Sequence, residues 1–218
     1  MRTITSIFLL LAAPLSLGCA SYETMDLDAD LRAGHFVQSR EKEGLVVAAE
    51  SYLEARKSQI HFWFDLGDEG FLPVVLYLDN LSDRGFILTR KKISLFLGDG
   101  TELATVPVEE VVSACRYGFA TSILYFPFFV FVGPIWSMVH RANLNFDMEV
   151  DYRRKDLFRG RSAMRIPRKS DLSGAVFFTL PSGGEANLDG ATVQVFLTRE
   201  KGAGESAPAQ VKFLLPLK

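Results

Sequence analysis

Short apolar runs separated by polar turns fill most of the chain, and this pattern predicts β-strands. Apolar residues alternate in Ile93–Leu97, Val193–Leu197 and Val211–Leu215, which is the period of a half-buried strand. Asp99-Gly100 is a typical hairpin turn. Further strands, rich in β-branched and aromatic residues, are predicted at 45–50, 62–66, 72–78, 86–89, 102–106, 163–166 and 175–180.

The pattern changes after Pro107, where a helical insertion is predicted over about 107–157. Glu109 and Glu110 follow the proline, and both residue types favour a helix start. No charged residue occurs from 117 to 139. Apolar residues then recur at helical spacing, and we expect a helical hairpin that turns near Gly133-Pro134. The recurring positions are Ile135, Val139, Ala142, Phe146 and Val150.

Strand patterns on both sides of this insertion predict one domain over 45–218. Seven or eight short strands with polar turns are typical of an immunoglobulin-like β-sandwich. The predicted fold class is therefore mainly β, with the apolar helical hairpin inserted between two halves of the sandwich. Strands from 45–106 are expected to pair with strands from 160–215.

The first residues resemble a bacterial lipoprotein signal. One basic residue, Arg2, precedes an apolar run that ends in Leu15-Ser16-Leu17-Gly18-Cys19, as in a secretory signal. Gly18-Cys19 is similar to a lipobox, although Ser16 stands where Leu is usual. The resemblance implies a signal peptide over 1–18, diacylglycerol on Cys19, and, because Ala20 is not Asp, sorting to the outer membrane. The polar, acidic residues of 19–44 are interpreted as a tether.

Several strand and turn residues carry a second resemblance. The chain is similar to uncharacterised bacterial lipoproteins with an immunoglobulin-like β-sandwich that is interrupted by an apolar helical segment. This resemblance implies a fold, and no activity or site comes with it. The residues concerned are Phe64-Asp65-Leu66, Gly70–Val74, Asp79-Asn80 and Ser173–Phe178.

Composition narrows the possible functions. The 218 residues are 48% hydrophobic, and 18 of them are Phe, so the chain can form a packed core. The net charge of −2 gives no basic field, and we expect no nucleic-acid partner. Cys115 is the only cysteine besides Cys19, so after lipidation it has no disulfide partner and is expected to be a small buried residue.

Catalytic and metal-binding patterns are missing from the sequence. The three histidines, His35, His61 and His140, lie far apart, and none has a neighbour at metal-ligand spacing. Asp26-x-Asp28-x-Asp30 begins like a calcium loop, but the sixth and twelfth positions are Leu31 and Val37 rather than Gly and Glu. We therefore expect no enzyme activity, no metal and no cofactor.

The apolar segment and the basic residues after it form the candidate membrane or partner surface. Three interpretations remain open: a hairpin packed against the sandwich, a hairpin that enters the lipid face or docks a partner, and a true membrane span through 117–139. The basic residues could meet lipid phosphates. The candidate surface residues are Phe126, Phe128, Phe129, Phe131, Trp136, Arg153, Arg154 and Lys155.

Together these features predict a lipid-anchored cell-envelope protein with a non-catalytic binding or structural role. It would be an outer-membrane lipoprotein that faces the periplasm, with the membrane and an unknown protein as partners. One alternative is a membrane-embedded subunit of an envelope complex, inserted through 117–139. Another is an envelope hydrolase whose site assembles from scattered polar residues.

Overall fold

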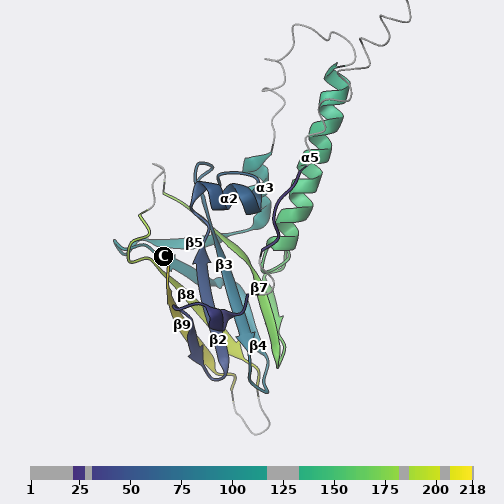
Figure 1. The fold of residues 1–218 in the computed structure, drawn as a ribbon. Helices are drawn as coiled ribbons and strands as arrows, with labels where there is room; N and C mark the ends of the chain where they lie inside the picture. The colour runs from purple at the N-terminus through teal and green to yellow at the C-terminus, as the bar shows by residue number, and fades with distance from the viewer. Residues whose placement is uncertain (1–21, 28–30, 117–132, 182–186, 202–206, 218) are drawn as a thin grey trace, which may run out of the picture.

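A nine-stranded antiparallel sheet forms the body of the molecule (Figure 1). The structure is a computed structural model that describes residues 22–27, 31–116, 133–181, 187–201 and 207–217, with the backbone alone for 133–140. The strand order is β1-β2-β3-β7-β5-β4-β8-β9, and β6 pairs with β4. The strands are β1 Arg40–Lys42, β2 Leu45–Ser51, β3 Phe71–Asn80, β4 Phe86–Phe96, β5 Glu102–Val106, β6 Ala163–Ile166, β7 Ser170–Thr179, β8 Thr192–Arg199 and β9 Gln210–Pro216.

Strands from the two sides of the insertion pair with each other, as expected. β3 pairs with β7 along its whole length, from Phe71 opposite Thr179 to Asn80 opposite Ser170. β4 pairs with β8, and β6 pairs with β4. The expected pairing of strands across the insertion is therefore observed.

The sheet is nearly closed. β5 bonds to β4 through Ala104 and to β7 through Thr105 and Val106, so it joins the two halves at one corner. At the other edge β9 lies beside β1 and β2, and Lys42 donates a hydrogen bond of 2.6 Å to the carbonyl of Lys212. The mainly β class is confirmed, but hydrogen bonds make one continuous sheet where two separate sheets were expected.

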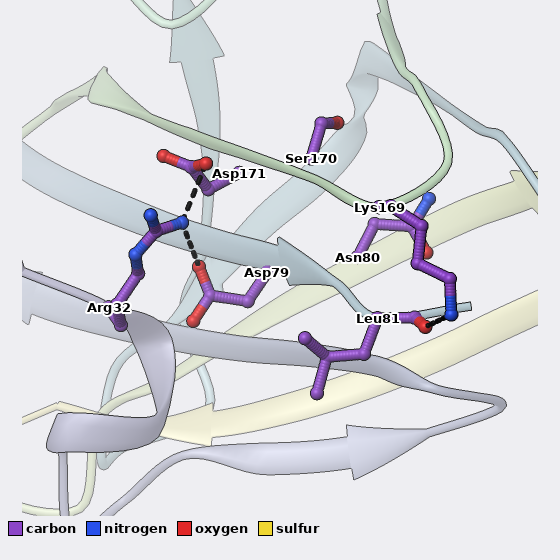
Figure 2. A pocket seen from close by; sticks show the side chains of 7 residues that line it. All are labelled: Arg32, Asp79, Asn80, Leu81, Lys169, Ser170 and Asp171. Atoms are coloured by element: carbon purple, nitrogen blue, oxygen red, sulfur yellow. Dashed lines mark hydrogen bonds and ion pairs between the residues drawn. The ribbon is translucent and has the colours of Figure 1, made fainter. Parts of the chain in front are cut away.

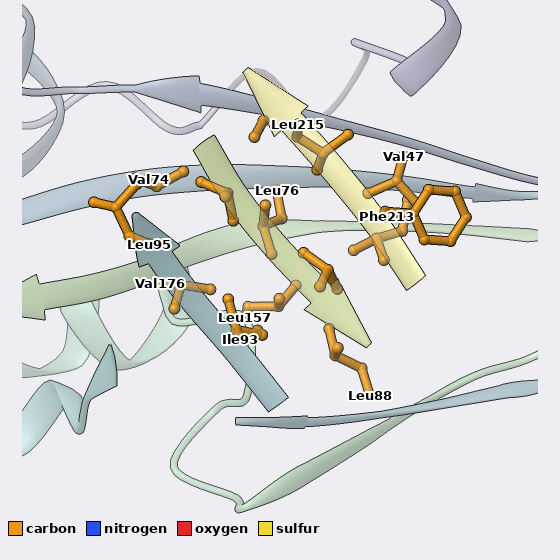
Figure 3. Packing of buried hydrophobic residues seen from close by; sticks show 14 of the residues in the cluster. Val47, Val74, Leu76, Leu88, Ile93, Leu95, Leu157, Val176, Phe213 and Leu215 are labelled. Atoms are coloured by element: carbon orange, nitrogen blue, oxygen red, sulfur yellow. The ribbon is translucent and has the colours of Figure 1, made fainter. Parts of the chain in front are cut away.

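Two apolar clusters stabilise the sheet, one on each side of β3. The inner core lies between the two halves of the sheet (Figure 3) and includes Leu76 of β3, Leu95 of β4 and Phe213 of β9. All ten residues of β3 are buried, because alternate side chains point to opposite faces and both faces are covered. Leu72, Val74, Leu76 and Leu78 belong to the inner core, and Phe71, Val75 and Tyr77 to the outer core.

In the described part of the chain, three α-helices cover the outer core. They are α2 (Ala55–Phe62), α3 (Val108–Cys115) and α5 (Gly133–Lys155), and α5 extends well beyond the sheet (Figure 1). Pro107 is the N-cap of α3 and Glu109 and Glu110 lie in its first turn, which confirms the predicted helix start. α5 corresponds to the second arm of the expected hairpin; the first arm, with residues 117–132, lies outside the described residues.

Three predicted strand segments differ from the structure. Residues 62–66 are not a strand: α2 ends at Phe62, and the hydroxyl of Ser58 donates to the carbonyl of Phe64 (2.8 Å) and accepts from the N–H of Leu66 (3.1 Å). These bonds fix a turn that aromatic composition alone does not reveal. The predicted segments 86–89 and Ile93–Leu97 belong to one strand, β4, which ends at Phe96 and has an irregularity between Leu88 and Ile93.

The interpretation of 19–44 as a tether is wrong for its described part. β1 pairs with β2, and a short 3-10 helix, η2 (Ala33–His35), precedes it. Leu27 and Ala33 are buried in the outer core. Polar composition suggested a free segment, but the few apolar residues within it are the ones that pack.

Candidate functional site

Residues 22–26 are held against α5 by a polar cluster that we name the N-terminal clasp. It consists of half-buried Tyr22 and Thr24 and of buried Asp151 and Lys155. The hydroxyls of Tyr22 and Thr24 donate to the same oxygen of Asp151, Oδ2, at 3.0 and 2.8 Å. The ammonium of Lys155 donates to that oxygen (2.7 Å), to Thr24 (2.8 Å) and to the carbonyl of His61. Residues 22–26 are therefore part of the fold.

The two buried charges of the clasp, on Asp151 and Lys155, are stabilised by each other and by the groups that bond to them. The side chains of Lys155 and Asp151 are only 2% and 7% exposed, and a buried charge is tolerated only when it is paired and hydrogen-bonded. Burial opposes ionisation of Asp151, but hydrogen bonds from Lys155 and Arg154 outweigh it and hold the pKa of Asp151 below its usual value. Burial, reinforced by the charge of Asp151, raises the pKa of the Tyr22 phenol, so that group stays a donor.

The basic residues predicted to face lipid or a partner are largely engaged within the chain. Lys155 is buried in the clasp, so its placement on a surface is wrong. Arg153 is exposed and pairs with Glu149 (3.0 Å) and Glu109 (2.9 Å). Arg154 is also exposed and pairs with Asp26 (2.5 Å) and Asp151 (2.8 Å). Such pairing leaves little net positive charge for headgroups.

The apolar candidates lie mostly outside the described part of the chain. Cys19, Phe126, Phe128, Phe129 and Phe131 are not among the described residues. Trp136 is in α5, within the stretch described by backbone alone.

The described part of α5 buries one face and exposes another. Met148 and Tyr152 pack in the outer core, and the Tyr152 hydroxyl donates to the carbonyl of Phe62 at 2.6 Å. On the opposite side Phe146 is 67% exposed and Val150 is 51% exposed. The apolar stripe found in the sequence is therefore the outward face here, which counts against a helix packed on the sheet by that stripe.

A second buried ion pair fixes the end of α5 to the sheet. The guanidinium of Arg90 donates to both carboxylate oxygens of Asp156 (3.1 and 2.9 Å), and the N–H of Gly160 donates to one of them (2.9 Å). Asp156 is fully buried, and Arg90 lies 4.6 Å over the ring of Phe158. This ion pair was not predicted from the sequence. Asp156 is the one acidic residue among the basic residues of 153–169, and this isolation was the signal that it has a specific partner.

A surface pocket of about 610 Å³ lies beside the end of β3 (Figure 2). Asp79 and Asp171 are cross-strand neighbours, and Arg32 bridges them at 4.0 and 2.6 Å. Lys169 donates to the carbonyl of Leu81 at 2.8 Å. Lys169 also pairs with Asp83 (3.2 Å), which lies outside the pocket, and the Ser170 hydroxyl donates to the carbonyl of Pro167 (2.7 Å). The lining residues of the pocket are Arg32, Asp79, Asn80, Leu81, Lys169, Ser170 and Asp171.

The remaining candidates for chemistry are not brought together. His35 lies in η2 and His61 in α2, on separate elements. Within the described ranges, no three His, Cys, Asp or Glu side chains cluster as metal ligands. Cys115 is a free, buried cysteine, and burial raises the pKa of its thiol to about 12, so the expectation of a small buried residue is confirmed.

No protein-family model, curated protein or solved structure matches this chain. Among the helices that the structure describes, none has both the length and the apolar character needed to cross a bilayer.

Proposed function

We propose that this chain is a lipid-anchored protein of the bacterial cell envelope, acylated on Cys19, with a non-catalytic binding or structural role. It would reside at the outer membrane and face the periplasm. The N-terminal clasp is the observation that carries the proposal: Tyr22, three residues after Cys19, is bonded to Asp151 at 3.0 Å. A lipid on Cys19 would therefore hold the folded body close to the bilayer.

The outer side of α5 and the apolar residues before it are the proposed binding surface. Phe146 and Val150 are exposed on a helix that extends beyond the sheet, and large apolar side chains gathered on one outward face are typical of an interaction site. The uncharged stretch 117–139 directly precedes that part of α5. A protein partner in the envelope and the lipid face itself are the two occupants of this surface that we propose.

A second candidate is a membrane-embedded subunit, inserted through residues 117–139. The exposed Phe146 and Val150 favour it, because these outward apolar side chains follow that uncharged stretch along the chain. The two candidates differ in how tightly the chain is held once the lipid is absent: an inserted segment would resist extraction at alkaline pH.

The narrower fold assignment is also a proposal. We propose that the chain is related to lipoproteins with an immunoglobulin-like sandwich. Two halves of the sheet pack across one inner core, as the two sheets of a β-sandwich do.

Replacement of Cys19 tests the proposed function. Cys19→Ser should abolish incorporation of labelled palmitate and release the chain from washed membranes, because no other residue would carry the lipid. Cys115→Ser is the matched control and should keep both properties, since Cys115 is buried. Retention of the label by Cys19→Ser would refute the proposal, and retention on membranes without the label would favour the embedded alternative.

A further inference from the structure

The structure contains a surface beside the clasp that fits a bilayer, and we infer that the mature protein rests on lipid through it. This anchor-side patch consists of Tyr22, Met25, Ile60 and Trp63. The inference rests on the proposed lipid at Cys19 and adds an orientation: α2, and not only the apolar stretch 117–139, faces the membrane.

The short distance from the lipid to the fold is the first argument. Two residues separate Cys19 from Tyr22, and an extended chain spans at most about 3.6 Å per residue, so the Cα atoms of Cys19 and Tyr22 are within about 11 Å. Tyr22 and Thr24 are both bonded to buried Asp151. The acyl chains must enter the bilayer at this point, and whatever surface surrounds Tyr22 must lie next to the headgroups.

The surface that surrounds Tyr22 is aromatic and apolar. The rings of Tyr22 and Trp63 lie 5.2 Å apart between centroids. Met25, whose N–H donates to the carbonyl of Ile60 at 2.9 Å, is 60% exposed, and Ile60 is 38% exposed. Single exposed apolar residues are ordinary, but a Trp–Tyr pair beside exposed Met and Ile has the composition of a membrane–water interface, where Trp and Tyr are enriched.

The backbone at Trp63 supports a role for its ring. Trp63 ends α2 in a left-handed conformation, with φ of 67°. This conformation is costly for a bulky side chain, and glycine usually occupies it at a helix end. Despite the unfavourable backbone conformation, this position carries a tryptophan, whose large amphipathic ring packs against Tyr22.

The charges around the patch are mixed: Glu23, next to Tyr22, is an exposed acid, and Arg56 is the basic group available to a phosphate headgroup. Arg56 is exposed and precedes Ile60 by four residues in α2, so the two side chains share a helix face. Asp26, the acid next to Met25, pairs with Arg154 at 2.5 Å. An arginine beside apolar residues can reach phosphate while its neighbours enter the interface.

The two tryptophans of the chain allow a direct test on the acylated, full mature protein. Trp136→Phe leaves Trp63 as the only tryptophan, and Trp63→Phe leaves Trp136. Each variant is purified, its acylation is checked by intact mass, and it is reconstituted in vesicles of phosphatidylethanolamine and phosphatidylglycerol. The vesicles carry a fluorescence quencher either near the headgroups or at the ends of the acyl chains.

We expect Trp63 fluorescence to be lost with the quencher near the headgroups and largely kept with the deep quencher. Adding Ile60→Asp should restore the fluorescence, whereas Leu214→Asp, at an exposed apolar residue of β9 that is 49% exposed, should not. If the protein is acylated but neither quencher reduces Trp63 fluorescence, the inference is wrong while the proposed function stands. The inference is also wrong if Trp63 is shielded from the quencher only when a second copy of the chain crosslinks to it. A purified chain without the acyl mass would remove the proposed function and, with it, this inference.

Discussion

At the scale of single residues, Gly174 allows the chain at the end of α5 to approach the sheet closely. Gly174 of β7 lies directly under Leu157: a Cβ built on the glycine would be 2.6 Å from the Cα of Leu157. The N–H of Leu157 also donates to the carbonyl of Ala175 at 2.9 Å. Close backbone approach, rather than a turn, is thus the reason for glycine at this position.

Gly174→Ala should therefore destabilise the protein, since backbone atoms cannot yield as a flexible side chain can. We expect a loss of about 1–3 kcal/mol in the free energy of unfolding, measured by denaturant titration. Gly34→Ala is the control: no heavy atom lies within 4 Å of its Cβ, and the change should stay within about 0.5 kcal/mol. Equal effects of the two substitutions would contradict the close contact.

At the scale of elements, α5 shows how an apolar pattern can mislead. An apolar stripe of this kind normally faces a core, but its described members Phe146 and Val150 are exposed. The buried face instead carries Met148 and Tyr152 together with charged Asp151 and Lys155. Charges at buried positions cannot be recognised without their partners, and Thr24 lies more than a hundred residues away in the chain.

Matched substitutions on the two faces of α5 check this assignment. Val150→Asp should change the free energy of unfolding by about 0.5 kcal/mol or less, because the side chain is half exposed. Met148→Asp, two residues earlier and 1% exposed, should cost about 3 kcal/mol or more, because it buries an unpaired carboxylate. A large cost for Val150→Asp would mean that this face is covered within the chain.

For the whole molecule, the sequence predicts most of the strands and their cross-insertion pairing, since alternating and β-branched segments determine where strands form. It does not predict the closure of the sheet, which depends on β5 bonding to two neighbours. Nor does it predict the anchor-side patch, because Tyr22 and Trp63 meet only after α2 and the N-terminal residues both pack on the outer core. The lipobox-like residues around Cys19 remain an argument from resemblance.

The N-terminal clasp links the packing of residues 22–26 to the stability of the whole fold. This contribution depends on pH because it depends on the ionisation of Asp151. The pKa of this carboxyl is held below its ordinary value of 3.8, so the folded state binds fewer protons there than the unfolded state. The stabilisation is fully present above that ordinary value and is lost as the pH falls through the lower, folded-state pKa. Acid should therefore weaken the clasp.

Asp151→Asn measures this contribution. At neutral pH the variant should lose about 3 kcal/mol in the free energy of unfolding, because Lys155 stays buried without its counter-charge. The difference between wild type and variant should shrink as the pH is lowered from about 5 to about 2, in parallel denaturant titrations. Glu41→Gln, on the exposed strand β1, is the control and should follow wild type throughout. A difference that stays constant down to the lowest pH would show that Asp151 acts through shape rather than charge, and that the residues next to the proposed lipid are held by packing alone.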